Sequence, residues 1–131
     1  MRIFLFITFL ITVIFLFAGG TTEIKGAKPK ILYGTASFYS NSFNGKKTAN
    51  GEIYSHKKMT AACNVLPLGT WIRVTNLRNG KSVVVKTNDR LHSKMKRVVD
   101  LSREAAEKLG YVKSGLTKVR VEVIGKKKPE K

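Results

Sequence analysis

Short apolar segments separated by polar turns make up most of the chain beyond residue 30. These segments are rich in β-branched and aromatic residues, and several alternate apolar with polar positions, at residues 31–39, 70–75, 81–87, 98–99 and 118–124. Alternation with a period of two is typical of strands that bury one face. Asn79-Gly80, between the second and third segments, is a strong signal for a hairpin. The pattern therefore predicts a domain built mainly from short strands.

One short helix is predicted just after residue 102. Ser102 is a good N-cap, Glu104 falls in the first turn, and Gly110 provides a C-terminal stop. The predicted apolar face consists of Leu101, Ala105, Ala106 and Leu109. We expect this helix to pack over one end of the strand structure. Many short strands with one small helix are typical of a compact β-barrel.

The beginning of the chain carries an export signal. An almost unbroken apolar run follows Met1 and Arg2 and ends in the small residues at 18–20. This order of basic, apolar and small residues is typical of a secretory signal peptide, so we expect residues 1–20 to be removed. An uncleaved anchor helix is the alternative, because the run is close to the ~20 residues that span a bilayer. Both interpretations place the rest of the chain outside the cytoplasm, and cleavage leaves no stable membrane anchor.

Composition separates the two ends from the middle of the chain. Residues 21–30 are small and charged, as in a linker, and residues 125–131 form a basic run that we expect to be disordered. A chain of 131 residues buries one modest core, so we predict one folded domain over residues 31–124. The single cysteine, Cys63, cannot form an intrachain disulfide, so the core must hold this domain together. We expect a monomer.

The chain is strongly basic, with 25 Lys and Arg residues against 8 Asp and Glu residues and a formal net charge of +17. Removal of residues 1–20 takes only Arg2 with it and leaves about +16. Such a charge favours an anionic partner, although lysines that only solvate the surface remain the alternative for individual positions. Nucleic acid is the usual polyanion inside a cell. Export instead favours the carboxylates and phosphates of a cell wall, and we expect no nucleic-acid partner.

Six short motifs occur in a fixed order and spacing along the predicted domain. They are Gly34-Thr-Ala-Ser-Phe-Tyr39, Phe43-Asn-Gly-Lys-Lys-Thr-Ala-Asn-Gly-Glu52, Met59-Thr-Ala-Ala-Cys-Asn-Val-Leu-Pro-Leu-Gly-Thr70, Arg73-Val-Thr-Asn76, Val85-Lys-Thr-Asn-Asp-Arg90 and Arg97-Val-Val-Asp-Leu-Ser102. In these motifs the chain resembles the rare lipoprotein A (RlpA) family. The resemblance implies a mainly β fold, a six-stranded double-psi β-barrel with one or two short helices. It also implies a place in the periplasm or cell envelope of a bacterium.

The resemblance implies an activity as well as a fold. Members similar to this chain are lytic transglycosylases, which cut the β-1,4 bond between N-acetylmuramic acid and N-acetylglucosamine in peptidoglycan glycan strands and leave a 1,6-anhydromuramyl end. Expansins share the barrel and loosen wall polymers without clear hydrolysis, so the fold alone does not decide catalysis. The alternative is therefore a non-catalytic, expansin-like protein that binds cell-wall glycan.

A lytic transglycosylase can work with a single carboxyl group. The 6-hydroxyl of the sugar attacks its own anomeric carbon, so one group can act first as acid and then as base without an activated water. The resemblance places this group at Asp89 and a second, assisting acid at Glu52. It also places Cys63 in the catalytic set, at a position where the family commonly has histidine. A thiol cannot carry the positive charge of an imidazolium.

The remaining expectations concern substrate contacts and metals. Tyr39, Asn50, Asn88 and Arg90 are predicted to contact the glycan, Tyr39 as an aromatic platform for a sugar ring. Asp100 also matches the family, and its place just before the helix favours a structural role. Cysteine, histidine and aspartate residues are present but lack the close pairing of metal ligands, so we expect no metal and no cofactor.

Overall fold

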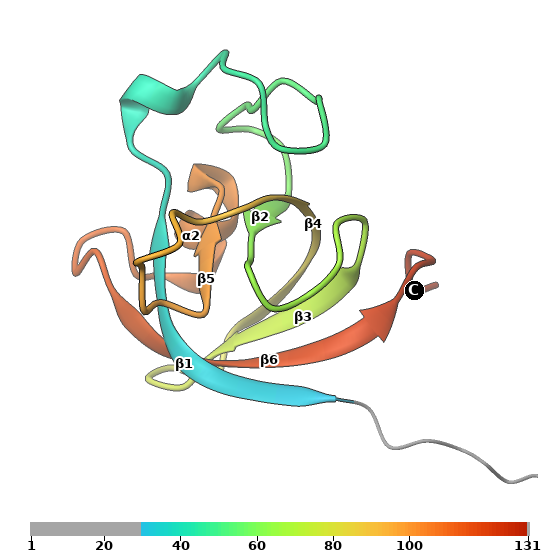
Figure 1. Cartoon of the computed structure of the whole chain (residues 1–131). Helices are drawn as coiled ribbons and strands as arrows, with labels where there is room; N and C mark the ends of the chain where they lie inside the picture. Colours follow the sequence, from blue (N-terminus) through green and yellow to red (C-terminus); the bar gives the residue numbers. More distant parts are fainter. Residues whose placement is uncertain (1–29, 131) are drawn as a thin grey trace, which may run out of the picture.

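The computed structural model describes residues 30–130, which form a closed six-stranded β-barrel (Figure 1). The strands lie in the order β1-β5-β2-β4-β3-β6, with β1 parallel to β5, β2 parallel to β4 and the other neighbours antiparallel. The elements are β1 (Ile31–Phe38), the 3₁₀ helix η1 (Asn41–Phe43), β2 (Thr60–Ala62), β3 (Trp71–Asn76), β4 (Ser82–Asp89), β5 (Val99–Leu101), α2 (Arg103–Leu109) and β6 (Thr117–Gly125). The predicted barrel with a short α-helix is thus confirmed.

Alternating residues of the long strands fill the barrel interior. Ile72 and Val74 of β3, Val85 of β4, and Val119 and Val121 of β6 are fully buried. These positions are the inward half of the period-two pattern in the sequence, because successive side chains of a strand point to opposite faces. The apolar pattern therefore sets which face of each strand forms the core.

Two local details differ from the sequence-based expectation. The short strand β2 joins β4 to β5 and was not among the predicted strands, because its three residues are small and show no alternating pattern. Leu101, which was predicted to lie on the apolar face of the helix, is the last residue of β5, although it is buried in the same core. The predicted caps are present, since Ser102 accepts the amide of Ala105 and Gly110 is left-handed with φ of 77°.

The segment between β1 and β2, which contains η1, lies at one end of the barrel (Figure 1). The expected signal peptide at residues 1–20 and the linker up to residue 29 lie outside the described residues. Within residues 30–130, no helix is long and apolar enough to cross a membrane. Beyond β6, the Nζ of Lys126 donates to the carbonyl of Leu68, and the Nζ of Lys128 lies 5.7 Å from the ring centroid of Trp71.

At Gly34 the segment before β5 packs closely against β1. A Cβ at Gly34 would lie 2.9 Å from the Cβ of Val98, and the Val98 amide donates to the Thr35 carbonyl at 2.9 Å. We expect Gly34→Ala to lower the free energy of unfolding by roughly 1–3 kcal/mol, as overpacking of a core usually does. Denaturant unfolding measures the change. Gly34→Ala combined with Val98→Gly, which removes the Cβ that the new side chain meets, should cost less than the sum of the two single substitutions, and a fully additive cost would contradict this explanation.

Candidate active site

Asp89 ends β4 and lies on a groove of about 510 Å³ at the end of the barrel where η1 lies. The end of β1 and the turn that follows form one wall, through Phe38, Tyr39 and Phe43. Segment 90–97 forms the other wall. Between the walls lies Ala62 of β2, a small side chain that leaves room above it. The groove is therefore open above the half-buried Asp89 carboxyl.

Three donors hold the Asp89 carboxylate in one orientation. Its Oδ1 accepts the backbone amides of Ala49 and Arg90, both at 2.9 Å, and its Oδ2 accepts the hydroxyl of Tyr39 at 2.6 Å. A carboxylate has about four acceptor positions, so the position without a protein donor lies on Oδ2. The Arg90 guanidinium donates to the carbonyls of Cys63 and Leu66 instead of to Asp89. Asp89 is thus oriented by neutral donors and keeps one free acceptor position.

Tyr39 contributes its hydroxyl to the site, whereas its ring is covered. The Tyr39 side chain stacks on Tyr54 with ring centroids 4.0 Å apart and meets the edge of Phe43 at 5.6 Å, and the residue is only 7% exposed. Burial, and then the hydrogen bond to Asp89, raises the pKa of Tyr39 far above its ordinary value. The hydroxyl therefore stays protonated and donates to Asp89 over the whole physiological range.

The exposed aromatic ring at this groove belongs to Phe43, which is 47% exposed. Sequence reasoning did not include Phe43 among the candidate site residues, because it lies outside the predicted strands, in a polar stretch. The signal that could have found it was a single large apolar residue among serine and asparagine, in a segment with no core pattern to explain it. An exposed aromatic face at a groove can cover the apolar face of a sugar ring.

Glu52 supports the turn that supplies one of the three donors. Its Oε1 accepts the side-chain amides of Asn50 at 2.8 Å and Asn88 at 3.1 Å, and its backbone carbonyl accepts the Thr48 amide at 2.7 Å. These hydrogen bonds, Asn50 first and Asn88 second, lower the pKa of Glu52. The structure therefore brings Glu52, Asn50 and Asn88 together behind Asp89, and none of the three lines the groove.

Cys63 lies next to Asp89 through its backbone. Its amide donates to the Asp89 carbonyl at 3.0 Å, while its side chain is fully buried in the main hydrophobic core and does not line the groove. The predicted catalytic set is thus divided in space, with Asp89 on the groove, Glu52 beside it and the Cys63 thiol in the core.

Asp100 also lines the groove, together with Arg97. Ala62 of β2 pairs with Asp89 on one side and with Asp100 of β5 on the other. The backbones of the two aspartates are therefore separated by two strand spacings, or about 10 Å, on either side of the groove floor. Asp100 accepts two hydrogen bonds from Arg97, at 2.7 and 3.0 Å. Within residues 30–130, no group of three or more His, Cys, Asp or Glu side chains is arranged to hold a metal ion.

Solved structures with the same fold identify the barrel type. The Streptomyces papain inhibitor matches 72% of this chain and 94% of its own with a TM-score of 0.60 and 19% identity. The Clavibacter michiganensis expansin matches 78% of this chain and 53% of its own, with a TM-score of 0.59 and 21% identity. A point mutant of that expansin, solved in complex with cellohexaose, matches 77% of this chain and 54% of its own with a TM-score of 0.58 and 20% identity. These similarities concern the fold alone, and they agree with the predicted double-psi β-barrel.

Sequence relatives identify the family. Residues 32–121 match the sequence model of a family described as "Lytic transglycolase". The endolytic peptidoglycan transglycosylase RlpA of Pseudomonas aeruginosa is 54% identical over 77% of this chain and 30% of its own length. The protein of the same name from Vibrio cholerae is 47% identical over 82% of this chain and 41% of its own length. The chain thus spans less than half of these relatives. With its motifs, barrel and family match in agreement, the chain belongs to the lytic transglycolase family, which includes the RlpA proteins.

Proposed function

We propose that this chain is an exported, endolytic peptidoglycan lytic transglycosylase in which Asp89 is the catalytic acid and base. The supporting observation is the Asp89 carboxyl itself, which is oriented by three donors and keeps one free acceptor position on Oδ2 beside an open groove. The endolytic activity named for the 54% identical relative supports the reaction class. On this proposal the chain works as a monomer in the bacterial periplasm.

The proposed reaction needs one carboxyl group and no water. The proton on Oδ2 of Asp89 passes to the glycosidic oxygen as the bond between that oxygen and C1 of the muramic acid breaks. The resulting carboxylate then takes the proton of the 6-hydroxyl while its oxygen bonds to C1. The 1,6-anhydro ring closes, the neighbouring sugar leaves with a free 4-hydroxyl, and Asp89 regains its proton.

Digestion of purified peptidoglycan tests this proposal directly. The protein should release glycan fragments with 1,6-anhydromuramyl ends, which mass spectrometry distinguishes from hydrolysed ends by the loss of one water. Fractionation of cells should recover the protein with the envelope. Binding to insoluble peptidoglycan without any anhydro product at any pH would refute the enzyme and leave the expansin-like binder as the function.

The Tyr39 hydroxyl should matter to the rate more than to stability. Tyr39→Phe keeps the ring stacked on Tyr54 but removes the donor that holds Oδ2 of Asp89. We expect kcat to fall by roughly tenfold, since the loss of one charge-assisted hydrogen bond loosens the acid, while KM and the melting temperature change little. Steady-state kinetics on soluble glycan strands measures both constants. A rise in KM at constant kcat would show instead that Tyr39 binds substrate.

A further inference from the structure

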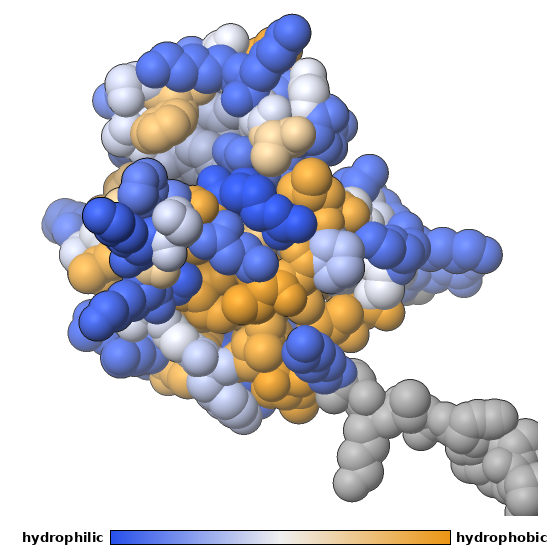
Figure 2. Space-filling model, viewed as in Figure 1, coloured by the Kyte–Doolittle hydropathy of each residue, from blue (hydrophilic) through white to orange (hydrophobic). Residues whose placement is uncertain are grey.

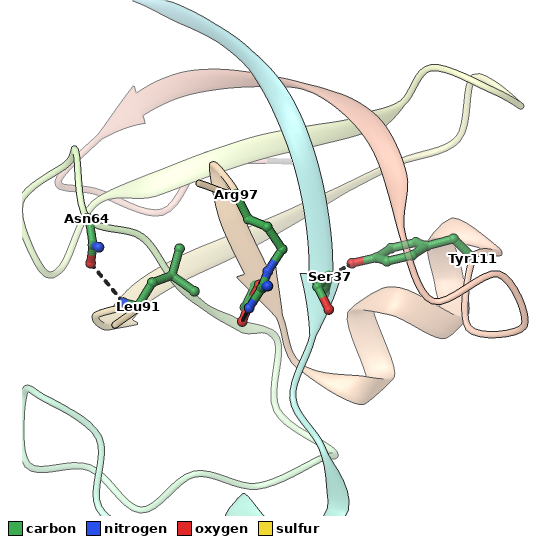
Figure 3. A network of polar contacts seen from close by, with 6 residues as sticks. Ser37, Asn64, Leu91, Arg97 and Tyr111 are labelled. Atoms are coloured by element: carbon green, nitrogen blue, oxygen red, sulfur yellow. Dashed lines mark hydrogen bonds and ion pairs between the residues drawn. The ribbon is translucent and has the colours of Figure 1, made fainter. Parts of the chain in front are cut away.

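Arg97 lies between two grooves. It lines the groove that contains Asp89, and it also lines a second groove of about 450 Å³ on the other side of segment 90–98. Figure 3 shows the Arg97 side chain between Leu91 and the part of β1 that contains Ser37. The second groove contains the exposed side chains of Tyr33, Val65 and Met95. Because the grooves share Arg97 and Met95, a ligand longer than one sugar can pass from one groove into the other.

The Arg97 guanidinium is held in one orientation, but only some of its N–H donors have a protein acceptor. Its Nε and Nη2 donate to the two carboxylate oxygens of Asp100, and within residues 30–130 its Nη1 donates to no protein acceptor. The side chain is 27% exposed, against 16% for Asp100, so its free N–H groups reach the groove space. The hydrogen bonds to Asp100 raise the pKa of Arg97, which keeps it charged. A guanidinium held in this way offers donors to an acceptor in the groove with little loss of side-chain freedom.

The charge around Arg97 is asymmetric. The lining of the Asp89 groove balances the carboxylates of Asp89 and Asp100 with Arg90 and Arg97, whereas the lining of the second groove includes Lys96 and Arg97 and, among the described residues, no carboxylate. The second groove also combines these cations with apolar side chains. On the face of the barrel drawn in Figure 2, apolar residues form a continuous area with hydrophilic side chains along its edges. This groove therefore suits a group that carries a carboxylate on an apolar stem.

We infer that Arg97, positioned by Asp100, binds the carboxylate borne by the C3 substituent of a muramic acid residue in the glycan strand. This inference rests on the proposed function, which supplies the strand. Peptidoglycan alternates a neutral sugar with one that carries an acidic lactyl group or, through it, an acidic peptide. A cation at a fixed distance from Asp89 gives this polymer one register, and the register decides which of its two alternating bonds lies over the acid. Arg97 is thus a specificity residue of this enzyme.

Binding to the full chain carrying Asp89→Asn tests the inference without consuming the ligand. Three probes are compared by calorimetry, namely peptide-stripped glycan fragments with free lactyl carboxylates, fragments that keep their peptides, and chitin oligomers of equal length, which lack the substituent. We expect Arg97→Gln to weaken binding of a carboxylate-bearing probe by roughly tenfold, as for one hydrogen-bonded charge, and to leave chitin binding unchanged. A loss of affinity for the peptide-stripped fragments identifies the lactyl carboxylate as the group bound by Arg97. A loss of affinity confined to the peptide-bearing fragments identifies a carboxylate of the peptide.

Controls separate recognition from a general effect on the fold or on charge. Lys113→Gln removes the same charge from an exposed position outside both grooves and should change no affinity. If Arg97→Gln does not fold, stripped and peptide-bearing fragments whose carboxylates have been amidated replace the variant, and they should bind roughly tenfold more weakly than the unmodified probes. Equal weakening of all three probes by Arg97→Gln, or unchanged affinity after amidation, would overturn the inference. Neither result bears on whether anhydro products form, so failure of the proposed function is detected separately.

Discussion

Replacement of Asp89 by asparagine should lower the rate of anhydromuramyl product formation by roughly a thousandfold, within the range that a positioned acid and base contributes. An amide cannot give and take back the proton that the proposed reaction passes through Oδ2. The fold should survive, because the asparagine carbonyl can still accept the amides of Ala49 and Arg90 and its nitrogen can donate to Tyr39. Single-turnover release of anhydro ends from glycan strands measures the rate.

A matched control removes a carboxylate of the same charge elsewhere. Glu107→Gln lies on the exposed side of α2 and should keep the full rate and the same melting temperature. If Asp89→Asn and Glu107→Gln release anhydro ends equally fast, Asp89 is not the acid. Binding of the Asp89→Asn chain to glycan strands should remain, since the groove keeps its shape.

Glu52→Ala should lower the rate by roughly a hundredfold through the position of Asp89. Without the Glu52 carboxylate, the side-chain amide of the buried Asn88 loses its acceptor, and the turn at residues 48–52 is joined to Asn88 of β4 through the Asn50 amide and the Asn88 carbonyl alone. The amide of Ala49, which donates to Asp89 from this turn, is then held less firmly. A shift of about 1 Å in a reacting group can cost a hundredfold in rate. The kcat on soluble glycan strands is the measurement.

Glu52→Gln distinguishes positioning from direct chemistry. A single oxygen of Glu52, Oε1, accepts both amides, and the glutamine carbonyl oxygen can take its place, so positioning predicts recovery of most of the rate lost in Glu52→Ala. A rate as low as that of the alanine variant would mean that the negative charge itself is required.

Comparison of the natural chain with Glu52→Gln also tests how the stability contributed by Glu52 depends on pH. Hydrogen bonds from Asn50 and then Asn88 lower the pKa of Glu52 in the folded state, so its stabilising contribution is complete above the ordinary value of 4.5. The contribution is lost as the pH falls through the lower folded pKa. The stability difference between the natural chain and Glu52→Gln should therefore be constant at neutral pH and narrow in acid. Denaturant unfolding at a series of pH values measures it, and a difference that widens in acid would contradict the assignment.

Much of the fold could be predicted from short stretches of neighbouring residues. The alternating strands, the Asn79-Gly80 turn and the Ser102 and Gly110 caps are all encoded within a few residues of the elements they define, and each is present. Strand β2 was missed because three small residues carry no pattern of their own, and only the backbones of β4 and β5 on either side make them a strand.

The sequence alone determined the family and the barrel and singled out Asp89 as the candidate acid, since motif order and side-chain alternation are properties of the chain itself. The roles of the neighbours were decided by the tertiary structure. It covered the Tyr39 ring with Tyr54, buried the Cys63 thiol in the core and left Phe43 exposed at the groove. It also brought Asp100 and Arg97 to the groove that contains Asp89, through the pairing of β2 with two other strands. The physical reason is that burial and hydrogen-bond partners depend on residues far apart in the chain, and spacing within one segment carries no information about them.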